Sequence, residues 1–277
     1  MKVEVWGCRG SLPSPGPEKN KYGGNTSCVE ISEGDTTIIL DGGSGIQRLG
    51  EKIGFEHKEV HILLTHLHID HTMGLGFFLP LYSPKVTVHL YGPAGSTQTL
   101  TERLRRYFSP PLFPVRLSEL PNHPIIHEVH KSEFNIGSLS ISTQYVCHPS
   151  ATVGYRISNG EKVFCYIPDH ELQVGACNFP NEPEWTSGYN LALNADLLFH
   201  DAQYQNAECC DRIGWGHSSF KEAMQFAEMC NVKKLAFFHH DPHRTDDQLE
   251  SILGELKGTE NTNVETEMCA EGSVYQL

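Results

Sequence analysis

Short runs of alternating apolar and polar residues occur along much of the chain, a pattern typical of β-strands with one buried face. The runs Leu139-Ser140-Ile141-Ser142 and Val153-Gly154-Tyr155-Arg156-Ile157 show it clearly. A continuous apolar run such as Leu235-Ala236-Phe237-Phe238 indicates a strand that is buried on both faces. The expected strands cover residues 3–8, 28–32, 36–40, 60–64, 86–91, several segments within 125–166, 196–200 and 234–238.

Helices are expected between these strands, mainly in the last third of the chain. A short helix follows Gly45, a second starts at Asp70, and others cover 97–107, 218–230 and 245–256. Ser219 and Glu222, three residues apart at the start of one of these helices, have the spacing of a capping box. Strands come first, helices alternate with strands later, and no polar linker divides the chain. This order predicts a single α/β (α+β) domain over residues 1–277, with two sheets and helices outside them.

The composition is that of an ordinary soluble globular protein, with 39% hydrophobic and 20% charged residues among 277. No apolar run has the length of a membrane span and no signal peptide precedes the first strand, so we expect a cytoplasmic protein without membrane contact. The nine cysteines have no regular spacing, which disfavours a disulfide framework. The net charge of −13 disfavours an extended nucleic acid as partner, but says little about a small anion beside bound metal ions.

The run Thr65-His66-Leu67-His68-Ile69-Asp70-His71 gathers four potential metal ligands directly after an expected buried strand. Side chains of an extended segment alternate between faces, so His66 and His68 point the same way. If the chain then turns into a helix, Asp70 and His71 return toward the same point. Imidazole and carboxylate groups suit zinc and its first-row neighbours, and four ligands on one short segment suggest two adjacent ions. The alternative is an exposed polar loop in which Asp70 caps a helix.

Further candidate ligands follow other expected strands. His148 lies after the strand that ends near Val146, Asp169 follows residues 163–167, and His239 and His240 follow residues 235–238. A single histidine or aspartate at a strand end is more often a turn residue. Several of them, each at the end of a buried strand, are hard to attribute to coincidence and predict a shared site.

The order of these candidate ligands resembles that of the metallo-β-lactamase-fold hydrolases over nearly the whole chain. The resemblance implies the metallo-β-lactamase fold, a four-layer αββα sandwich with a two-metal site at one edge of the two sheets. The implied ligands are His66, His68 and His148 for the first metal, Asp70, His71 and His239 for the second, and Asp169 as a bridge between them.

Two details of this implied site depend on single positions. Asp41, in Leu40-Asp41-Gly42-Gly43, matches the acid that orients ligand histidines in the family. His239 is preferred to His240 because it lies nearer the strand, with a one-residue slip left open. The expected cofactors are two divalent ions, with zinc first and manganese or iron as alternatives. Two ions about 3.5–4 Å apart lower the pKa of a bridging water from about 16 to about 7 and hold it as a nucleophile.

Two residues outside the implied ligand set, a histidine and an aspartate, indicate which kind of bond is cleaved. His217, in Trp215-Gly216-His217-Ser218-Ser219, and Asp201, in Phe199-His200-Asp201-Ala202, resemble the paired histidine and acid of the phosphodiesterase branch of this fold. That branch includes the tRNA 3′-end-processing endonucleases. By this resemblance Asp201 orients His217, which assists the leaving oxygen. The alternative is that His217 belongs to a helix-capping turn and Asp201 to a surface turn.

The N-terminal runs around Arg9, Asn25 and Ser27 also resemble the phosphodiesterase branch, so these three residues are candidates to line the pocket. A tight glycine turn is an equally good explanation of the run from Tyr22 to Cys28, and the roles of Arg9 and Asn25 stay open. The leading hypothesis is a dinuclear metal-dependent hydrolase of a small phosphodiester, such as a cyclic nucleotide. Its expected catalytic residues are Asp70, His217 and Asp201.

Other functions remain open at this point. A tRNA 3′-processing endoribonuclease is the nearest alternative, but Arg103, Arg105 and Arg106 form the only basic cluster of the sequence, which favours a small substrate. A lactamase, a thioester hydrolase and a metal-loaded binding or sensor module are further alternatives. His68 stands where the oxygen-reducing di-iron branch has glutamate, which disfavours that branch. The oligomeric state is open, with a homodimer among the options.

Overall fold

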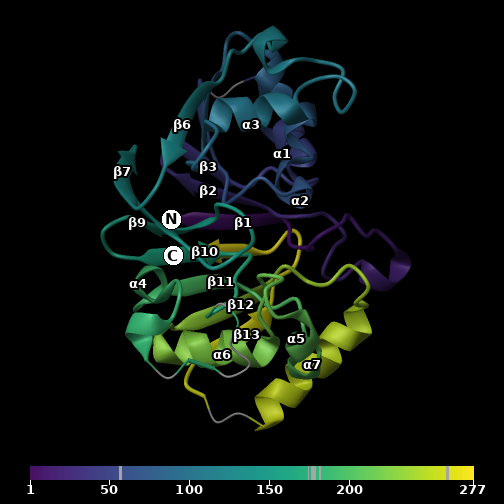
Figure 1. The fold of residues 1–277 in the computed structure, drawn as a ribbon, viewed down its shortest axis with the longest axis vertical. Helices are drawn as coiled ribbons and strands as arrows, with labels where there is room; N and C mark the ends of the chain where they lie inside the picture. The colour runs from purple at the N-terminus through teal and green to yellow at the C-terminus, as the bar shows by residue number, and fades with distance from the viewer. Residues whose placement is uncertain (56–57, 174, 176–178, 181, 260–261) are drawn as a thin grey trace.

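Two β-sheets lie face to face, with helices on the outer face of each (Figure 1). The computed structural model describes residues 1–55, 58–173, 175, 179–180, 182–259 and 262–277. The first sheet has the strand order β14-β1-β2-β3-β4-β5-β6 and the second the order β13-β12-β11-β10-β9-β8-β7. Figure 1 shows α1 and α3 beyond the first sheet and α6 and α7 beyond the second. The predicted αββα sandwich is therefore confirmed.

The strands of both sheets are short. In the first sheet they are β1 (Lys2–Gly7), β2 (Cys28–Glu33), β3 (Thr36–Leu40), β4 (Glu59–Leu63), β5 (Thr87–Pro93), β6 (Ile125–Val129) and β14 (Val274–Gln276). In the second they are β7 (Ser132–Ile136), β8 (Leu139–Tyr145), β9 (Val153–Ser158), β10 (Val163–Ile167), β11 (Leu197–Asp201), β12 (Lys234–Phe238) and β13 (Glu265–Met268).

The pairing of these strands brings several carboxyl ends to the same edge of the sandwich. Strands β3 to β6 are parallel to one another, and so are β10 to β13. Strand β8 also runs in the direction of β10, because both pair antiparallel with β9. Loops that follow β3, β4, β8, β10, β11 and β12 can therefore meet.

The helices are α1 (Ile46–Ile53), α2 (Ile69–Thr72), α3 (Leu100–Tyr107), α4 (Tyr189–Ala192), α5 (Asn206–Cys209), α6 (Phe220–Met229) and α7 (Asp246–Thr259). Short 3-10 turns occur at Pro17–Lys19, Leu75–Phe77, Leu79–Tyr82, Leu117–Glu119, Pro183–Trp185 and Cys210–Arg212. Within the described residues, no helix is both long and apolar enough to cross a membrane.

Three apolar layers hold the sandwich together. Side chains such as Tyr155, Phe199 and Phe238 fill the space between the sheets. Leu49 belongs to the cluster that packs the first sheet against α1 and α3, and Phe226 to the one that packs the second against α6 and α7. This burial explains why the central strands are apolar on both faces.

The structure also differs from the expected elements at several points. The helix expected from Asp70 is a single turn that begins at Ile69 and is followed by 3-10 turns. The helix expected over 97–107 begins only at Leu100, because the Thr99 side chain accepts the Glu102 N–H and caps it there. The predicted capping box of Ser219 and Glu222 is present at α6. Strands β13 and β14 were not expected, since neither carries an apolar run.

Candidate metal centre and active site

The candidate ligands lie in loops that follow strands of both sheets. The segment from His66 to His71 comes after β4, His148 after β8, Asp169 after β10 and His239 directly after β12. Because these carboxyl ends share one edge of the sandwich, residues up to about 170 positions apart in sequence come together. The structure therefore brings the whole predicted ligand set into one cluster.

Three histidines form the first group of this cluster. The ring nitrogens of His66, His68 and His148 lie within 4.8 Å of one another. His148 Nε2 is 3.1 Å from His68 Nδ1. His66 Nε2 is buried and has no hydrogen-bond partner among the described residues. A buried nitrogen lone pair without a donor is unfavourable, and a metal ion would satisfy it.

Asp70, His71 and His239 form the second group. His239 Nε2 is 3.2 Å from Asp70 Oδ2 and 3.4 Å from His71 Nε2. Asp169 lies between the groups: its Oδ1 is 3.0 Å from His71 Nε2, and its Oδ2 is 3.7 Å from His148 Nε2. The arrangement fits two cations that share Asp169.

Hydrogen bonds fix the tautomer of three of these histidines. His71 Nδ1 is 2.8 Å from Asp41 Oδ2, His148 Nδ1 is 2.8 Å from the Gly216 carbonyl, and His239 Nδ1 is 2.9 Å from Gln203 Oε1. Each acceptor holds a proton on Nδ1, so Nε2 is the ring nitrogen that faces the cluster.

The choice between the two adjacent histidines after β12 follows from where their rings lie. The ring of His239 is in the cluster, whereas His240 Nε2 donates to the Cys269 carbonyl at 2.8 Å. The backbone of His239 has a φ of 59°, in the left-handed region that few residues other than glycine adopt. Asp41 has the same unusual backbone, with a φ of 60°. Such conformations gather at functional sites, where the surrounding structure enforces them.

The electrostatics of the cluster favour bound cations. Burial by itself would raise the pKa values of the Asp70 and Asp169 carboxyls, but the neighbouring histidines hold both pKa values below the ordinary range. Burial would lower the pKa of His71, and the carboxylates of Asp169, Asp70 and Asp41 instead raise it well above its usual value. Burial and the charge of His71 keep the pKa of His66 well below normal. Positive charge is thus favoured among the carboxylates, where the second ion would bind.

His217 and Asp201 lie beside both groups. His217 Nδ1 is 2.6 Å from Asp201 Oδ2, and the His217 ring centre is 5.2 Å from that of His148 and 5.0 Å from that of His239. Asp201 is fully buried. Burial lowers the pKa of His217, but the Asp201 carboxylate outweighs it, and the pKa rises to about 9. His217 is therefore placed to carry a proton next to the cluster.

Backbone groups hold this pair in place. Asp201 accepts hydrogen bonds from the His170 N–H and the Gln203 N–H, both at 3.0 Å. Glu171 accepts from the Gly214 N–H at 3.0 Å and from the Gly216 N–H at 3.1 Å, which anchors the loop that carries His217.

Some contributors to the site carried no signal in the sequence. The Ser11 N–H donates to Asp70 Oδ2 at 2.7 Å, and the Gly216 carbonyl orients His148. Both act through the backbone, which any residue type provides. Gln203 lies two residues after Asp201, and a search for glutamine near strand ends would have found it.

The contacts of Arg9, Asn25 and Ser27 favour a structural role over a place in the pocket. The buried Arg9 guanidinium donates to the carbonyls of Gly23, Asp241 and Arg244, and the Asn25 amide donates to Glu271. These contacts tie N-terminal loops to the end of the chain. The buried Ser27 gives its carbonyl to the Gly43 N–H.

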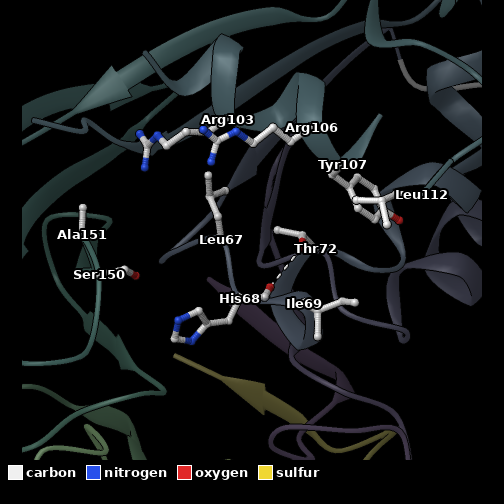
Figure 2. A pocket seen from close by; sticks show the side chains of 10 residues that line it. All are labelled: Leu67, His68, Ile69, Thr72, Arg103, Arg106, Tyr107, Leu112, Ser150 and Ala151. Carbon is white, nitrogen blue, oxygen red and sulfur yellow. Dashed lines mark hydrogen bonds between the residues drawn. The ribbon is translucent and has the colours of Figure 1, made fainter. Parts of the chain in front are cut away.

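An open pocket of about 350 Å³ lies beside His68 (Figure 2). Leu67, Ile69, Tyr107 and Leu112 give it an apolar wall, and Arg103 and Arg106 of α3 lie along its edge. Ser150 and Ala151 close the opposite side. A substrate that fills this pocket would reach the first group of histidines.

Comparison with known sequences finds relatives that are named ribonuclease Z. The ribonuclease Z of Haloarcula marismortui is 23% identical in an alignment of 280 positions that covers 86% of each protein. The ribonuclease Z of Thermococcus onnurineus is 24% identical in an alignment of 273 positions that covers 84% of each protein.

Solved structures share the fold at lower identity. The metallo-beta-lactamase fold protein YhfI from Bacillus subtilis superposes with a TM-score of 0.71 at 20% identity, over 99% of this chain and 98% of that one. The short form of human tRNase Z gives 0.67 at 20% identity, over 100% and 99% of the two chains. A diphosphatase from the PhnP family gives 0.67 at 16% identity, over 99% and 96%.

The match to a family model decides the assignment. The model described as the beta-lactamase superfamily domain matches residues 36–240, which include β3, the whole cluster and the His217–Asp201 pair. Together with the αββα sandwich and the edge cluster, this match shows that the chain belongs to the metallo-β-lactamase superfamily.

Proposed function

We propose that the protein is a dinuclear metal-dependent phosphodiesterase. The observation that carries this proposal is the 2.6 Å contact between His217 and Asp201 beside both ligand groups. Cleavage of a phosphodiester releases an alkoxide, and a positioned acid that protonates it typically contributes 10²–10⁴-fold to the rate. Neither a lactam nor a thioester releases an alkoxide, so an acid placed to protonate one favours phosphodiesters over these alternatives.

The residues present fit two divalent ions. His66, His68 and His148 would hold the first, Asp70, His71 and His239 the second, and Asp169 would contact both. Nitrogen and carboxylate ligands suit zinc first, with manganese or iron as alternatives. When bound, such a metal pair supplies an activated water and neutralises charge on the phosphoryl oxygens.

The remaining steps fall to side chains of this protein. Asp201 accepts a hydrogen bond from the His217 Nδ1–H, so the Nε2–H of the protonated ring is free to protonate the leaving oxygen. Two backbone N–H groups donate to Asp201 and keep this carboxylate oriented. A hydrogen bond from the Ser11 N–H holds the Asp70 carboxylate in place. With its acid and its ligands held by the fold, the site supports general acid catalysis at the leaving group.

The size of the substrate separates two versions of this function. The net charge of −13 favours a small diester. The expectation that an extended nucleic acid is disfavoured is, however, at odds with the name ribonuclease Z that the curated relatives carry. An RNA-processing endonuclease is therefore the second candidate function.

Metal content and a substrate panel test the proposal together. We expect two metal ions per chain, and hydrolysis of bis(p-nitrophenyl) phosphate or a nucleotide diester but not of a β-lactam or a thioester. His217→Asn should lower kcat by about 10²–10⁴-fold without loss of metal. One ion per chain, or no hydrolysis of any phosphodiester including precursor tRNA, would overturn the proposal. Two bound ions without turnover would instead indicate a binding or sensor module.

A matched control addresses a second group of possible ligands far from the site. Glu59, His61 and His89 also lie within 4.8 Å of one another, on β4 and β5. His89→Gln should keep both ions and full activity, whereas His239→Gln should lose one ion and the activity. If His89→Gln lowers the metal content instead, the ions counted in the wild type are not those of the proposed centre.

A further inference from the structure

The pocket beside His68 combines an apolar wall with two cationic side chains (Figure 2). Arg103 and Arg106 extend from α3 over Leu67, on the side of the pocket away from His68. Tyr107 lies next to them and is held by its hydroxyl, which donates to the Met73 carbonyl at 2.6 Å. The Tyr107 side chain is thus fixed beside an opening that reaches His68, one of the candidate ligands.

Within the described residues, the arginines of α3 form no close ion pair with a carboxylate. Among the described residues, no carboxylate oxygen lies within 4.0 Å of a guanidinium nitrogen of Arg103, Arg105 or Arg106, although the protein has 34 acidic residues. Arg103 donates to the Pro93 carbonyl, and its Nε is buried without a hydrogen-bond partner. Burial lowers the pKa of Arg103 although the charge of Glu128 opposes it, and a further anion beside the guanidinium would raise that pKa. Glu102 acts on Arg105 and Arg106 through its charge but makes no ion-pair contact with them. Cations without a bound carboxylate at the edge of a pocket are suited to an anionic ligand.

The wall and the cations fit different parts of one ligand. Tyr107, Leu67 and the exposed Leu112 offer apolar surface on which a nucleobase or sugar can lie, because stacking on such side chains accepts any base. A guanidinium binds phosphate through paired hydrogen bonds. The phosphoryl group to be cleaved must sit at the metal cluster, so a phosphate at Arg106 is a second one.

We propose, on the basis of the proposed function, that this pocket is a subsite for a second phosphate and that the preferred substrate is a phosphodiester that carries one. A plain cyclic mononucleotide has a single phosphate and leaves the subsite empty. A short linear nucleotide with a terminal phosphate and a longer RNA chain both fill it. The shared chemistry is a nucleoside that connects the cleaved phosphodiester to the additional phosphate.

Matched dinucleotides test this subsite. The substrates are ApA, pApA and ApAp, with bis(p-nitrophenyl) phosphate and a 3′,5′-cyclic nucleotide as compounds without a second phosphate. The wild type should cleave pApA or ApAp at least tenfold more efficiently, in kcat/KM, than ApA. Arg106→Gln should bring that ratio close to one, because it should lower kcat/KM on the substrate with a second phosphate far more than on ApA. A longer oligoribonucleotide cleaved no better than the preferred dinucleotide would identify the small ligand as the source of the second phosphate.

Arg105 provides the control on the same helix. It is exposed and does not line the pocket, so Arg105→Gln removes an equal charge at a neighbouring position and should retain the full ratio. The subsite proposal is overturned if Arg105→Gln and Arg106→Gln lower the ratio equally. It is also overturned if the wild type cleaves ApA as efficiently as pApA and ApAp. In either case the proposed phosphodiesterase function still stands. If no diester is cleaved, the proposed function fails, and calorimetric binding of pApA to wild type and Arg106→Gln still decides the subsite. Equal affinities would then refute it.

Discussion

Replacement of Asp41 by asparagine tests how the fold prepares the metal centre. The Asp41 carboxylate is fully buried, and each of its oxygens is committed. Oδ1 accepts the Thr65 N–H at 2.7 Å, and Oδ2 accepts from His71 Nδ1 at 2.8 Å and from the Tyr166 hydroxyl at 3.0 Å. An amide has one oxygen and one NH2 group, so it cannot accept at both ends.

Each orientation of the asparagine has its own consequence. If the NH2 group faces His71, His71 Nδ1 must accept, and its proton moves to Nε2, the nitrogen that would bind the metal. If the NH2 group faces Thr65, the buried Thr65 N–H loses its acceptor, which costs about 1–3 kcal/mol. The metal-free protein can adopt the first orientation, but metal binding requires the second. Since about 1.4 kcal/mol corresponds to tenfold in affinity, Asp41→Asn should weaken metal binding by about 10–100-fold.

Competition with a chromophoric chelator measures this affinity, and urea unfolding of the metal-free protein measures stability separately. Tyr166→Phe is the matched control, because it removes a donor from the same oxygen and leaves the His71 tautomer alone. It should change metal affinity by less than about threefold. The reasoning is refuted if Asp41→Asn binds metal within threefold of the wild type, or if Tyr166→Phe loses as much affinity as Asp41→Asn.

Three further predictions concern the loops and the sheets. Gly216 has a φ of 83°, and a Cβ there would lie 2.3 Å from His148 Nδ1, so Gly216→Ala should displace His148 and reduce metal uptake at the first group in a metal titration. Ser219→Ala removes the cap of α6 and should lower the free energy of unfolding by about 0.5–2 kcal/mol in urea. Burial, with the charge of His89, lowers the pKa of His61 to about 4, below the value of about 6.5 expected in the unfolded chain. The unfolded state therefore takes up the proton first, and stability should fall as the pH drops from about 6.5 toward 4. His61→Gln should lose less stability than the wild type between pH 7.5 and pH 5, and an equal loss would show that His61 is not the group involved.

The ligand set could be predicted from the sequence because metal chemistry limits both the residue types and their places. His66 and His68 follow a buried strand, and His239 follows another, so parallel strands deliver them to one edge. His239 and His240 could not be separated with certainty, since the left-handed backbone at His239 decides which ring turns inward. No local sequence pattern predicts the left-handed backbone of His239, because that conformation depends on the loops packed around it.

Residues that act through long-range packing were the ones whose role the sequence left open. Arg9 and Asn25 stand in a motif-like run, but their partners Asp241, Arg244 and Glu271 lie more than 200 positions away. A motif shows which residue types occur together and does not show what each one contacts. The short strands β13 and β14 were missed for a related reason: they pair at sheet edges, where hydrogen bonds to β12 and β1 matter more than an apolar pattern.

The histidines of the site are oriented by acceptors that the backbone holds in turn. The Thr65 N–H holds Asp41, which orients His71, and the N–H groups of His170 and Gln203 hold Asp201, which orients His217. The Gln203 side chain orients His239 as well, so one residue links the proposed acid to a proposed ligand. These hydrogen bonds join the loops after β3, β4, β10 and β11, so the packing of these loops decides which ring nitrogen of each histidine faces the cluster. Because the fold orients the rings in this way, less conformational freedom remains to be lost when a metal ion binds there.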